Sequence, residues 1–169
     1  MLQRTVKFLA VAALGGALVL ALFSSRASGA AAPAGVTIGG VFQLKSAADQ
    51  SFCLDIDNQG PTPRLILSQC TAALSQRFSF TRGADGLSLM IDSQGNCLST
   101  GAKSGPNFFG VSDAPCRYTG KERWALSLTG TLTQGTKGRC LVIPRVAANV
   151  SVNLVPCQEV TLQQWRLSQ

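Results

Sequence analysis

The sequence predicts an all-β domain built from three similar repeats, with one disulfide bond in each repeat. Three observations support this prediction. Six cysteines recur at regular intervals, an aromatic residue follows every second cysteine at a fixed distance, and short segments rich in β-branched and aromatic residues lie between turn residues. After residue 35, no segment has the sustained 3.6-residue apolar period of an amphipathic helix.

The repeat is defined by three positions that return in the same order. A Cys-Leu pair comes first, a second cysteine follows, and an aromatic residue with Gln or Glu two places before it closes the motif. The three sets are Cys53, Cys70 and Phe78; Cys97, Cys116 and Trp124; and Cys140, Cys157 and Trp165. The cysteines are 17, 19 and 17 residues apart, the aromatic residue always follows by 8, and the first cysteine recurs after 44 and 43 residues. Such a period is typical of repeat architectures.

Four short strands are expected in each repeat, which gives twelve in the domain. The expected strands alternate apolar and polar side chains, and turn residues such as Gly, Asn and Pro separate them. They cover residues 42–47, 51–57, 64–70 and 77–82 in the first repeat; 87–91, 96–100, 108–111 and 124–128 in the second; and 131–134, 140–143, 152–155 and 165–167 in the third.

The cysteines predict disulfides rather than a metal site. All six follow residue 50, and an even number in an exported chain indicates a disulfide framework. Zinc is disfavoured because the sequence has no histidine and no Cys-x-x-Cys pair. Pairing that treats the repeats alike gives Cys53–Cys70, Cys97–Cys116 and Cys140–Cys157, each worth roughly 3 kcal/mol. A cyclic pairing between repeats is also threefold, but it must join Cys157 back to Cys53.

The first 30 residues have the pattern of a secretory signal peptide. Arg4 and Lys7 give a positive start, the run from Phe8 to Phe23 is apolar or glycine, and small residues follow from Ala27. The run of 16 residues is shorter than the ~20 that a membrane-spanning helix requires, so an uncleaved anchor is the weaker alternative. We therefore expect a secreted, extracellular protein with no membrane span after cleavage. The expected parts are a signal peptide at 1–30, a linker at 31–38, and one domain at 39–169 with repeats at about 39–82, 83–128 and 129–169.

Composition and charge indicate a globular domain without a nucleic-acid surface. Hydrophobic residues make up 46% of the chain and charged residues 14%, which is enough apolar material to fill a core. From Ala31 onward there are 12 basic and 8 acidic residues, a net charge of +4, and these charges are scattered singly. Nucleic-acid binding requires clustered cations that neutralise several phosphates, so a nucleic-acid partner is not expected.

The repeated Cys-Leu, second cysteine and Gln-x-aromatic pattern resembles the ricin B-type (R-type) lectin family. The resemblance covers Gly39 to Gln169 and implies a β-trefoil fold. It also implies that the aromatic residue of each repeat packs into a shared core. These residues are Phe78, Trp124 and Trp165.

The same resemblance implies up to one shallow sugar site per repeat. In the family, an Asp two residues after the first cysteine accepts hydrogen bonds from sugar hydroxyls, an aromatic ring near the second cysteine stacks on the sugar, and an Asn and the motif Gln complete the ring of polar groups. The first repeat keeps Asp55 and Gln76, and Asp57 lies on the same strand face as Asp55. It has Ser68 in place of the ring and Ser75 in place of the Asn. The expected carbohydrate-binding residues are Asp55, Asp57 and Gln76.

The other two repeats depart from the sugar-binding pattern. The second has Ser99, Ala114 and Glu122 at the three places, and the third has Val142, Val155 and Leu162 while keeping Gln163. Their sugar sites are therefore expected to be lost. Two structural alternatives apply in addition: Asp55 can cap the bend at residues 57–60, and Gln76 and Gln163 can tie the core turn together instead of touching a ligand.

The sequence offers little for catalysis, so we expect no enzyme activity, no cofactor and no metal. Histidine, the usual general base, is absent, and every cysteine is expected to be paired. Asp85, Asp92 and Asp113 are expected to be isolated, and no glycine-rich phosphate loop opens a helix.

Two other motifs are less specific. Asn149-Val150-Ser151 is an N-glycosylation sequon, which matters only in a eukaryotic host. Phe108 and Phe109 could stack on a ligand, but adjacent strand residues point to opposite faces, so we expect one in the core and one on the outer side.

The resemblance and the residues together predict a secreted, lectin-like carbohydrate-binding protein, with a glycan or glycoprotein as partner and one partly kept sugar site. The alternative is a protein-interaction trefoil that has lost sugar binding, such as the receptor-binding subunit of a toxin or a protease-inhibitor-like module with a protein partner. The loss of two sugar sites favours this alternative, whereas the repeated cysteine pattern argues against its inhibitor branch.

Overall fold

The computed structural model describes residues 39–83, 85–103, 109–135 and 137–169, and these residues form an all-β domain. The expected signal peptide, the linker and Phe108 lie outside the described residues, and the side chain of Phe109 is not among those described. Within the described ranges, no helix is long and apolar enough to span a membrane.

Thirteen strands and three short 3-10 turns follow one another along the described residues. The first repeat contains β1 (Val41–Ser46), β2 (Phe52–Asp57), β3 (Arg64–Gln69), η1 (Leu74–Gln76) and β4 (Phe78–Arg82). The second contains β5 (Ser88–Asp92), β6 (Asn96–Lys103), β7 (Phe109–Pro115), η2 (Gly120–Glu122) and β8 (Arg123–Leu126). The third contains β9 (Leu132–Gln134), β10 (Arg139–Val142), β11 (Val150–Ser151), β12 (Asn153–Pro156), η3 (Thr161–Gln163) and β13 (Trp165–Ser168). The third repeat has one strand more than expected, because the two-residue β11 pairs with β3 of the first repeat.

Six of the strands pair in a closed ring, two from each repeat. β1 pairs with β4, β4 with β5, β5 with β8, and β8 with β9. A bridge between Thr131 and Gln164, at the starts of β9 and β13, continues the ring, and β13 pairs with β1 to close it. Closing a sheet in this way removes the exposed edges that promote aggregation.

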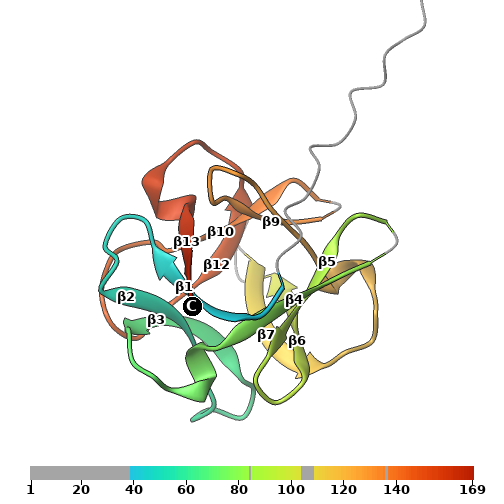
Figure 1. Ribbon diagram of the computed structural model, residues 1–169, viewed down its shortest axis with the longest axis horizontal. Coiled ribbons are helices and arrows are strands. Elements are labelled where there is room, and N and C mark those ends of the chain that lie inside the picture. Colours follow the sequence, from blue (N-terminus) through green and yellow to red (C-terminus); the bar gives the residue numbers. More distant parts are fainter. Residues whose placement is uncertain (1–38, 84, 104–108, 136) are drawn as a thin grey trace, which may run out of the picture. The chain divides into compact units, whose positions relative to one another are not determined.

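Six of the seven remaining strands form three hairpins around the ring. The hairpins are β2–β3, β6–β7 and β10–β12, and each joins a ring strand of its own repeat. Their outer strands also pair, β3 with β7 and β7 with β12, and the remaining strand, β11, pairs with β3. The three repeats therefore follow one another around a common centre, as Figure 1 shows.

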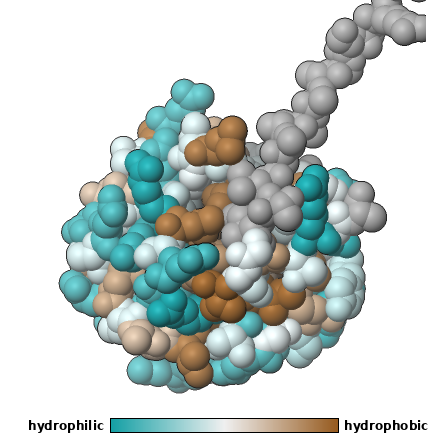
Figure 2. Space-filling view, in the orientation of Figure 1, coloured by the Kyte–Doolittle hydropathy of each residue, from teal (hydrophilic) through white to brown (hydrophobic). Residues whose placement is uncertain are grey.

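The core is filled by side chains that occupy equivalent places in the repeats. Phe78, Trp124 and Trp165 are all buried, which confirms the predicted core positions. Trp124 Nε1 donates to the carbonyl of Leu98 at 2.8 Å, and Trp165 Nε1 donates to the carbonyl of Leu141 at 3.2 Å. Each of these carbonyls belongs to the Cys-Leu pair of its own repeat, whereas Phe78 has no ring N–H to donate. Figure 2 shows hydrophobic side chains gathered toward the centre of one face and hydrophilic ones around its rim.

The disulfides join the two cysteines within each repeat. Cys53–Cys70, Cys97–Cys116 and Cys140–Cys157 have Cα–Cα distances of 4.9, 4.9 and 4.8 Å, and none of the six cysteines is free. The pairing that treats the repeats alike is therefore confirmed. Each bridge closes the start of one hairpin strand onto the end of its partner, so it fixes the register of that hairpin.

Candidate functional site

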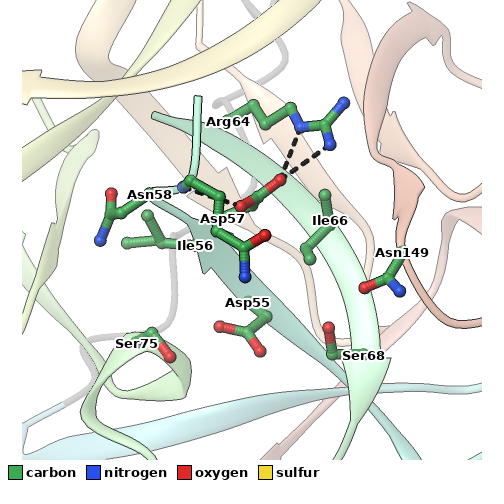
Figure 3. Close-up of a pocket in the computed structure, with 10 residues that line it drawn as sticks. Asp55, Ile56, Asp57, Asn58, Arg64, Ile66, Ser68, Ser75 and Asn149 are labelled. Carbon is green, nitrogen blue, oxygen red and sulfur yellow. Dashed lines mark hydrogen bonds and ion pairs between the residues drawn. The ribbon is translucent and has the colours of Figure 1, made fainter. Parts of the chain in front are cut away.

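A hollow of about 500 Å³ lies beside the β2–β3 hairpin of the first repeat. Figure 3 shows Asp55 between Ser68 and Ser75, and the ion pair of Asp57 and Arg64 to one side. The lining residues are Asp55, Ile56, Asp57, Asn58, Gln59, Arg64, Ile66, Ser68, Ser75 and Asn149.

Strand alternation places the two aspartates on the outer face of β2. Leu54 and Ile56 are buried in the core, so Asp55 and Asp57 point to the opposite side, where both are partly exposed. The prediction that the two carboxylates share one face of the strand is therefore confirmed. Both line the hollow, but they make different contacts there.

Gln76 fixes one carboxylate oxygen of Asp55. The buried amide of Gln76 donates through Nε2 to Asp55 Oδ2 at 2.9 Å and to the carbonyl of Gln69 at 2.8 Å. Asp55 Oδ1 is also buried, and it has no hydrogen-bond partner among the described residues. A carboxylate oxygen without a donor is costly, so Asp55 presents one fixed oxygen and one oxygen that needs a donor.

Gln76 belongs to a hydrogen-bond pattern that all three repeats share. The side chain at this place accepts from the backbone N–H five residues earlier: Thr71 to Gln76 at 2.8 Å, Arg117 to Glu122 at 3.0 Å, and Gln158 to Gln163 at 2.6 Å. Gln76 and Gln163 also donate to the carbonyl seven residues earlier. The prediction that these glutamines tie the core turn is confirmed, and the Glu122 carboxylate keeps only the accepting half.

Asp57 is engaged by its own loop. Its Oδ1 accepts from the backbone N–H of Gln59 at 3.0 Å, and its Oδ2 contacts Arg64 Nε and Nη2, both at 2.8 Å. The N–H of Gln59, and after it the Arg64 guanidinium, hold the pKa of Asp57 below its ordinary value. The cap on the bend at residues 57–60 is therefore provided by Asp57, and the expectation that Asp55 caps it is wrong. Asp55 instead bonds to Gln76.

The third repeat contributes Asn149 to the wall of the hollow, which the sequence did not predict. The backbone N–H of Asn149 donates to the carbonyl of Leu67 at 2.7 Å, and β11 begins at the next residue and pairs with β3. Asn149 is exposed and has a φ of 60°, a left-handed conformation that Asn adopts more easily than most residues. Its sequence neighbours reveal only a sequon, because the contact joins residues about 80 positions apart.

Two of the aspartates expected to be isolated lie together, so that expectation is wrong for them. Asp92 and Asp113 are both buried, and Asn96 connects them: its backbone N–H donates to Asp92 at 2.7 Å and its side chain donates to Asp113 at 3.2 Å. Burial, and then the neighbouring Asp92 carboxylate, raise the pKa of Asp113 to about 6. They meet because β6 pairs with both β5 and β7, and Asp92, at the end of β5, caps the turn between β5 and β6.

Across the ranges that the structure describes, no three Asp, Glu or Cys side chains are close enough to hold a metal ion.

Comparison with known proteins identifies the fold. No protein-family model and no curated protein sequence matches the chain. A designed three-fold symmetric protein, ThreeFoil, matches with a TM-score of 0.69 at 18% identity, over 78% of this chain and 99% of that one. The C-half of an earthworm R-type lectin, solved with GalNAc, matches with a TM-score of 0.58 at 16% identity, over 77% and 98%. The described residues therefore have the β-trefoil fold that these proteins share.

A further β-trefoil supports the same assignment. The ricin B-like lectin of Macrolepiota procera, solved in complex with lactose, matches with a TM-score of 0.65 at 11% identity, over 79% of this chain and 98% of that one. At these identities the likeness establishes the fold. The chemistry of the site depends on the residues of this chain.

Proposed function

We propose that this protein is a secreted, lectin-like carbohydrate-binding protein whose one sugar site is the hollow of the first repeat. The observation that carries the proposal is Asp55, a carboxylate fixed by Gln76 through one oxygen and without a donor on the other. Sugar hydroxyls are the donors that such an oxygen binds, and a hydrogen bond to a charged acceptor contributes about 1.5–3 kcal/mol. The lectins with the same fold, solved with GalNAc and with lactose, support this class of ligand.

The lining of the hollow supports a polar ligand. Ser68, Ser75 and Asn149 offer hydroxyl and amide groups around Asp55, while the Arg64–Asp57 ion pair forms one side. Ser68 takes the place at which the family has an aromatic ring, so the apolar face of a sugar has no flat partner there. Recognition therefore depends on hydroxyl hydrogen bonds.

We expect weak binding for two physical reasons. The missing ring removes the apolar half of recognition, and the buried Oδ1 of Asp55 must turn toward the hollow before a hydroxyl can reach it. That rearrangement costs free energy and so weakens the net binding. A dissociation constant near 1 mM, or about −4 kcal/mol, is the expected scale. High avidity would require several copies of the protein on one surface.

Titration of the mature protein with simple galactosides, followed by backbone amide NMR, tests this proposal. We expect shifts at residues 55–60 and at Gln76, and we expect Asp55→Asn to abolish them without a large change in the unfolding midpoint. Ser99→Ala, at the matching place of the second repeat, is the control and should bind like the wild type. Shifts centred on the second or third repeat, or normal binding by Asp55→Asn, would refute the proposal.

A second candidate function is a protein-interaction trefoil that has lost sugar binding, with no catalytic activity in either case. The departures at Ser99, Ala114, Val142 and Val155 favour it, because they remove the carboxylate and the ring from two of three repeats. A glycan array probed with the mature chain separates the two candidates. Binding to any glycan that Asp55→Asn loses supports the lectin, whereas a silent array together with no shifts in the NMR titration supports the protein partner.

A further inference from the structure

A second hollow, of about 340 Å³, lies where the second and third repeats meet. It is formed by the end of β6, the 3-10 turn η2, and the β9–β10 hairpin. The lining residues are Thr100, Gly101, Gly120, Lys121, Gln134, Lys137 and Arg139. None of them is a residue of the first-repeat hollow, and only Lys121 stands at a place of the family's sugar site, that of the Asn, five residues after the second cysteine.

Three cationic side chains meet at this hollow. Lys121 lies in η2, Lys137 in the turn between β9 and β10, and Arg139 at the start of β10. The sequence shows them as scattered single charges, but the fold brings η2 and β9 together: Gln134 Nε2 donates to the carbonyl of Gly120 at 2.7 Å. The lining contains no carboxylate, and within the described residues neither Lys121 nor Lys137 makes an ion pair.

Gln134 adds an acceptor to these cations. Its side chain is 2% exposed, and its Oε1 has no hydrogen-bond partner among the residues that the structure describes. The bond from Nε2 to Gly120 fixes which end of the amide is which, so Oε1 is the group left to accept. An unpaired buried amide oxygen favours a donor, and a simple anion supplies none.

The two hollows have opposite charge. The first is lined by Asp55 and Asp57 against one cation, Arg64, and the second is lined by three cations and no anion. A ligand suited to the second hollow must carry a negative group for the cations and a hydroxyl for Gln134. We propose that this hollow binds an acidic sugar unit, through a carboxylate or sulfate group on Lys121 and Lys137 and a hydroxyl on Gln134. This inference goes beyond the proposed neutral-sugar site and uses different residues.

The experiment titrates the mature chain with galacturonate and with galactose 6-sulfate, using galactose as the neutral probe. We expect amide shifts at Lys121, Gln134 and Lys137 for the two acidic sugars and not for galactose. The double variant Lys121→Ala and Lys137→Ala should weaken acidic-sugar binding about tenfold, and rising salt should weaken it further. Arg166→Ala, which removes an exposed cation that does not line the hollow, is the control and should bind like the wild type.

Three results would overturn the inference. Inorganic sulfate that binds as well as galactose 6-sulfate would show an anion site with no part for a sugar hydroxyl. Equal losses in Arg166→Ala and in the double variant would show attraction to net charge only, and unchanged binding by the double variant would remove the lysines from the site. Asp55→Asn should leave acidic-sugar binding unchanged, so failure here and failure of the first-repeat site are separate results.

Discussion

Asp113 in β7 occupies the place that Leu67 holds in β3, three residues before the second cysteine of its repeat. Leu154 holds the same place in the third repeat, and both leucines are buried in the core. Asp113 is buried as well, at 5% exposure, and its Oδ1 has no hydrogen-bond partner among the described residues. The second repeat therefore has a carboxyl group where the other two have an apolar side chain.

We predict that the contribution of Asp113 to stability decreases as the pH rises from about 4 to 7. Its pKa is about 6 in the folded state, against an ordinary value of 3.8, so the folded protein keeps a proton that the unfolded chain releases. The contribution is full below 3.8 and is lost as the pH rises through 6. Its size is at most about 3 kcal/mol. Denaturant midpoints across this range, measured on the wild type and on Asp113→Asn, give the contribution by difference.

Subtracting the Asp113→Asn values also cancels the contributions of groups whose pKa is lowered in the folded protein. Hydrogen bonds from Ser51 hold the pKa of Asp49 below its ordinary value, as Gln59 and Arg64 do for Asp57, so their contributions are lost as the pH falls below 3.8. Those groups are present in both proteins. Equal pH slopes for the wild type and the variant would contradict the prediction.

Replacing Asp113 by the residue of the other repeats should stabilise the protein. Asp113→Leu removes a buried polar group with an unpaired oxygen and restores the side chain found at Leu67 and Leu154, so we expect a gain of about 1–3 kcal/mol at neutral pH. Thermal and denaturant unfolding measure the change. The reverse substitution, Leu67→Asp, is the control and should destabilise by several kcal/mol, roughly the cost of an unpaired buried carboxylate. A destabilised Asp113→Leu protein would mean that the Asn96–Asp92–Asp113 bonds contribute more than apolar packing.

The buried tryptophans should carry much of the core stability. Trp124→Ala removes a fully buried ring and its 2.8 Å bond to the Leu98 carbonyl, and we expect a loss of about 3–5 kcal/mol. Leu128, 91% exposed just after β8, is the control, and Leu128→Ala should be nearly neutral. Denaturant midpoints decide between the outcomes. A near-neutral Trp124→Ala would mean that the ring lies on the surface in solution.

What the sequence predicted depends on how far apart the contacting residues are. The strands, the disulfides and the core positions of Phe78 and Trp165 follow from spacing within one repeat, and the threefold recurrence makes that spacing visible. The hydrogen bond between Asp55 and Gln76 was not predicted, although the resemblance named both residues, because spacing shows which residues recur and not which atoms meet. The partnership of Asp92 with Asp113 joins β5 and β7, which do not pair with each other but both pair with β6.

The sequence did not predict contacts between repeats, because spacing within one repeat does not show them. Asn149 lines the first-repeat hollow because β11 pairs with β3. Lys121 and Lys137 line one hollow because Gln134 of β9 donates to the carbonyl of Gly120 in η2. Neither pairing has a periodic pattern in the sequence. The residues that depart from the threefold symmetry of the domain could therefore be placed only with the structure.

Asn149 should contribute directly to sugar binding in the first repeat. Its carboxamide lines the hollow on the side of Ser68, where the sequence has no aromatic ring, so it can replace stacking with a hydrogen bond to a hydroxyl (Figure 3). Asn149→Gly removes the carboxamide and suits the φ of 60°, so the fold should be kept. Loss of one neutral hydrogen bond predicts affinity for galactosides about two- to tenfold weaker, measured by the same NMR titration.

The sequon gives Asn149 a second, independent test. Asn149 is exposed, so expression in a host that performs N-glycosylation should attach a glycan there, detected as added mass on the intact protein. Because the residue lines the hollow, the attached glycan would cover the opening, and galactoside binding should fall below that of the unmodified chain. Ser151→Ala prevents the modification while keeping Asn149, and it should restore binding in that host. Equal binding by the glycosylated protein, by Asn149→Gly and by the wild type would place the ligand away from this wall and remove Asn149 from the site.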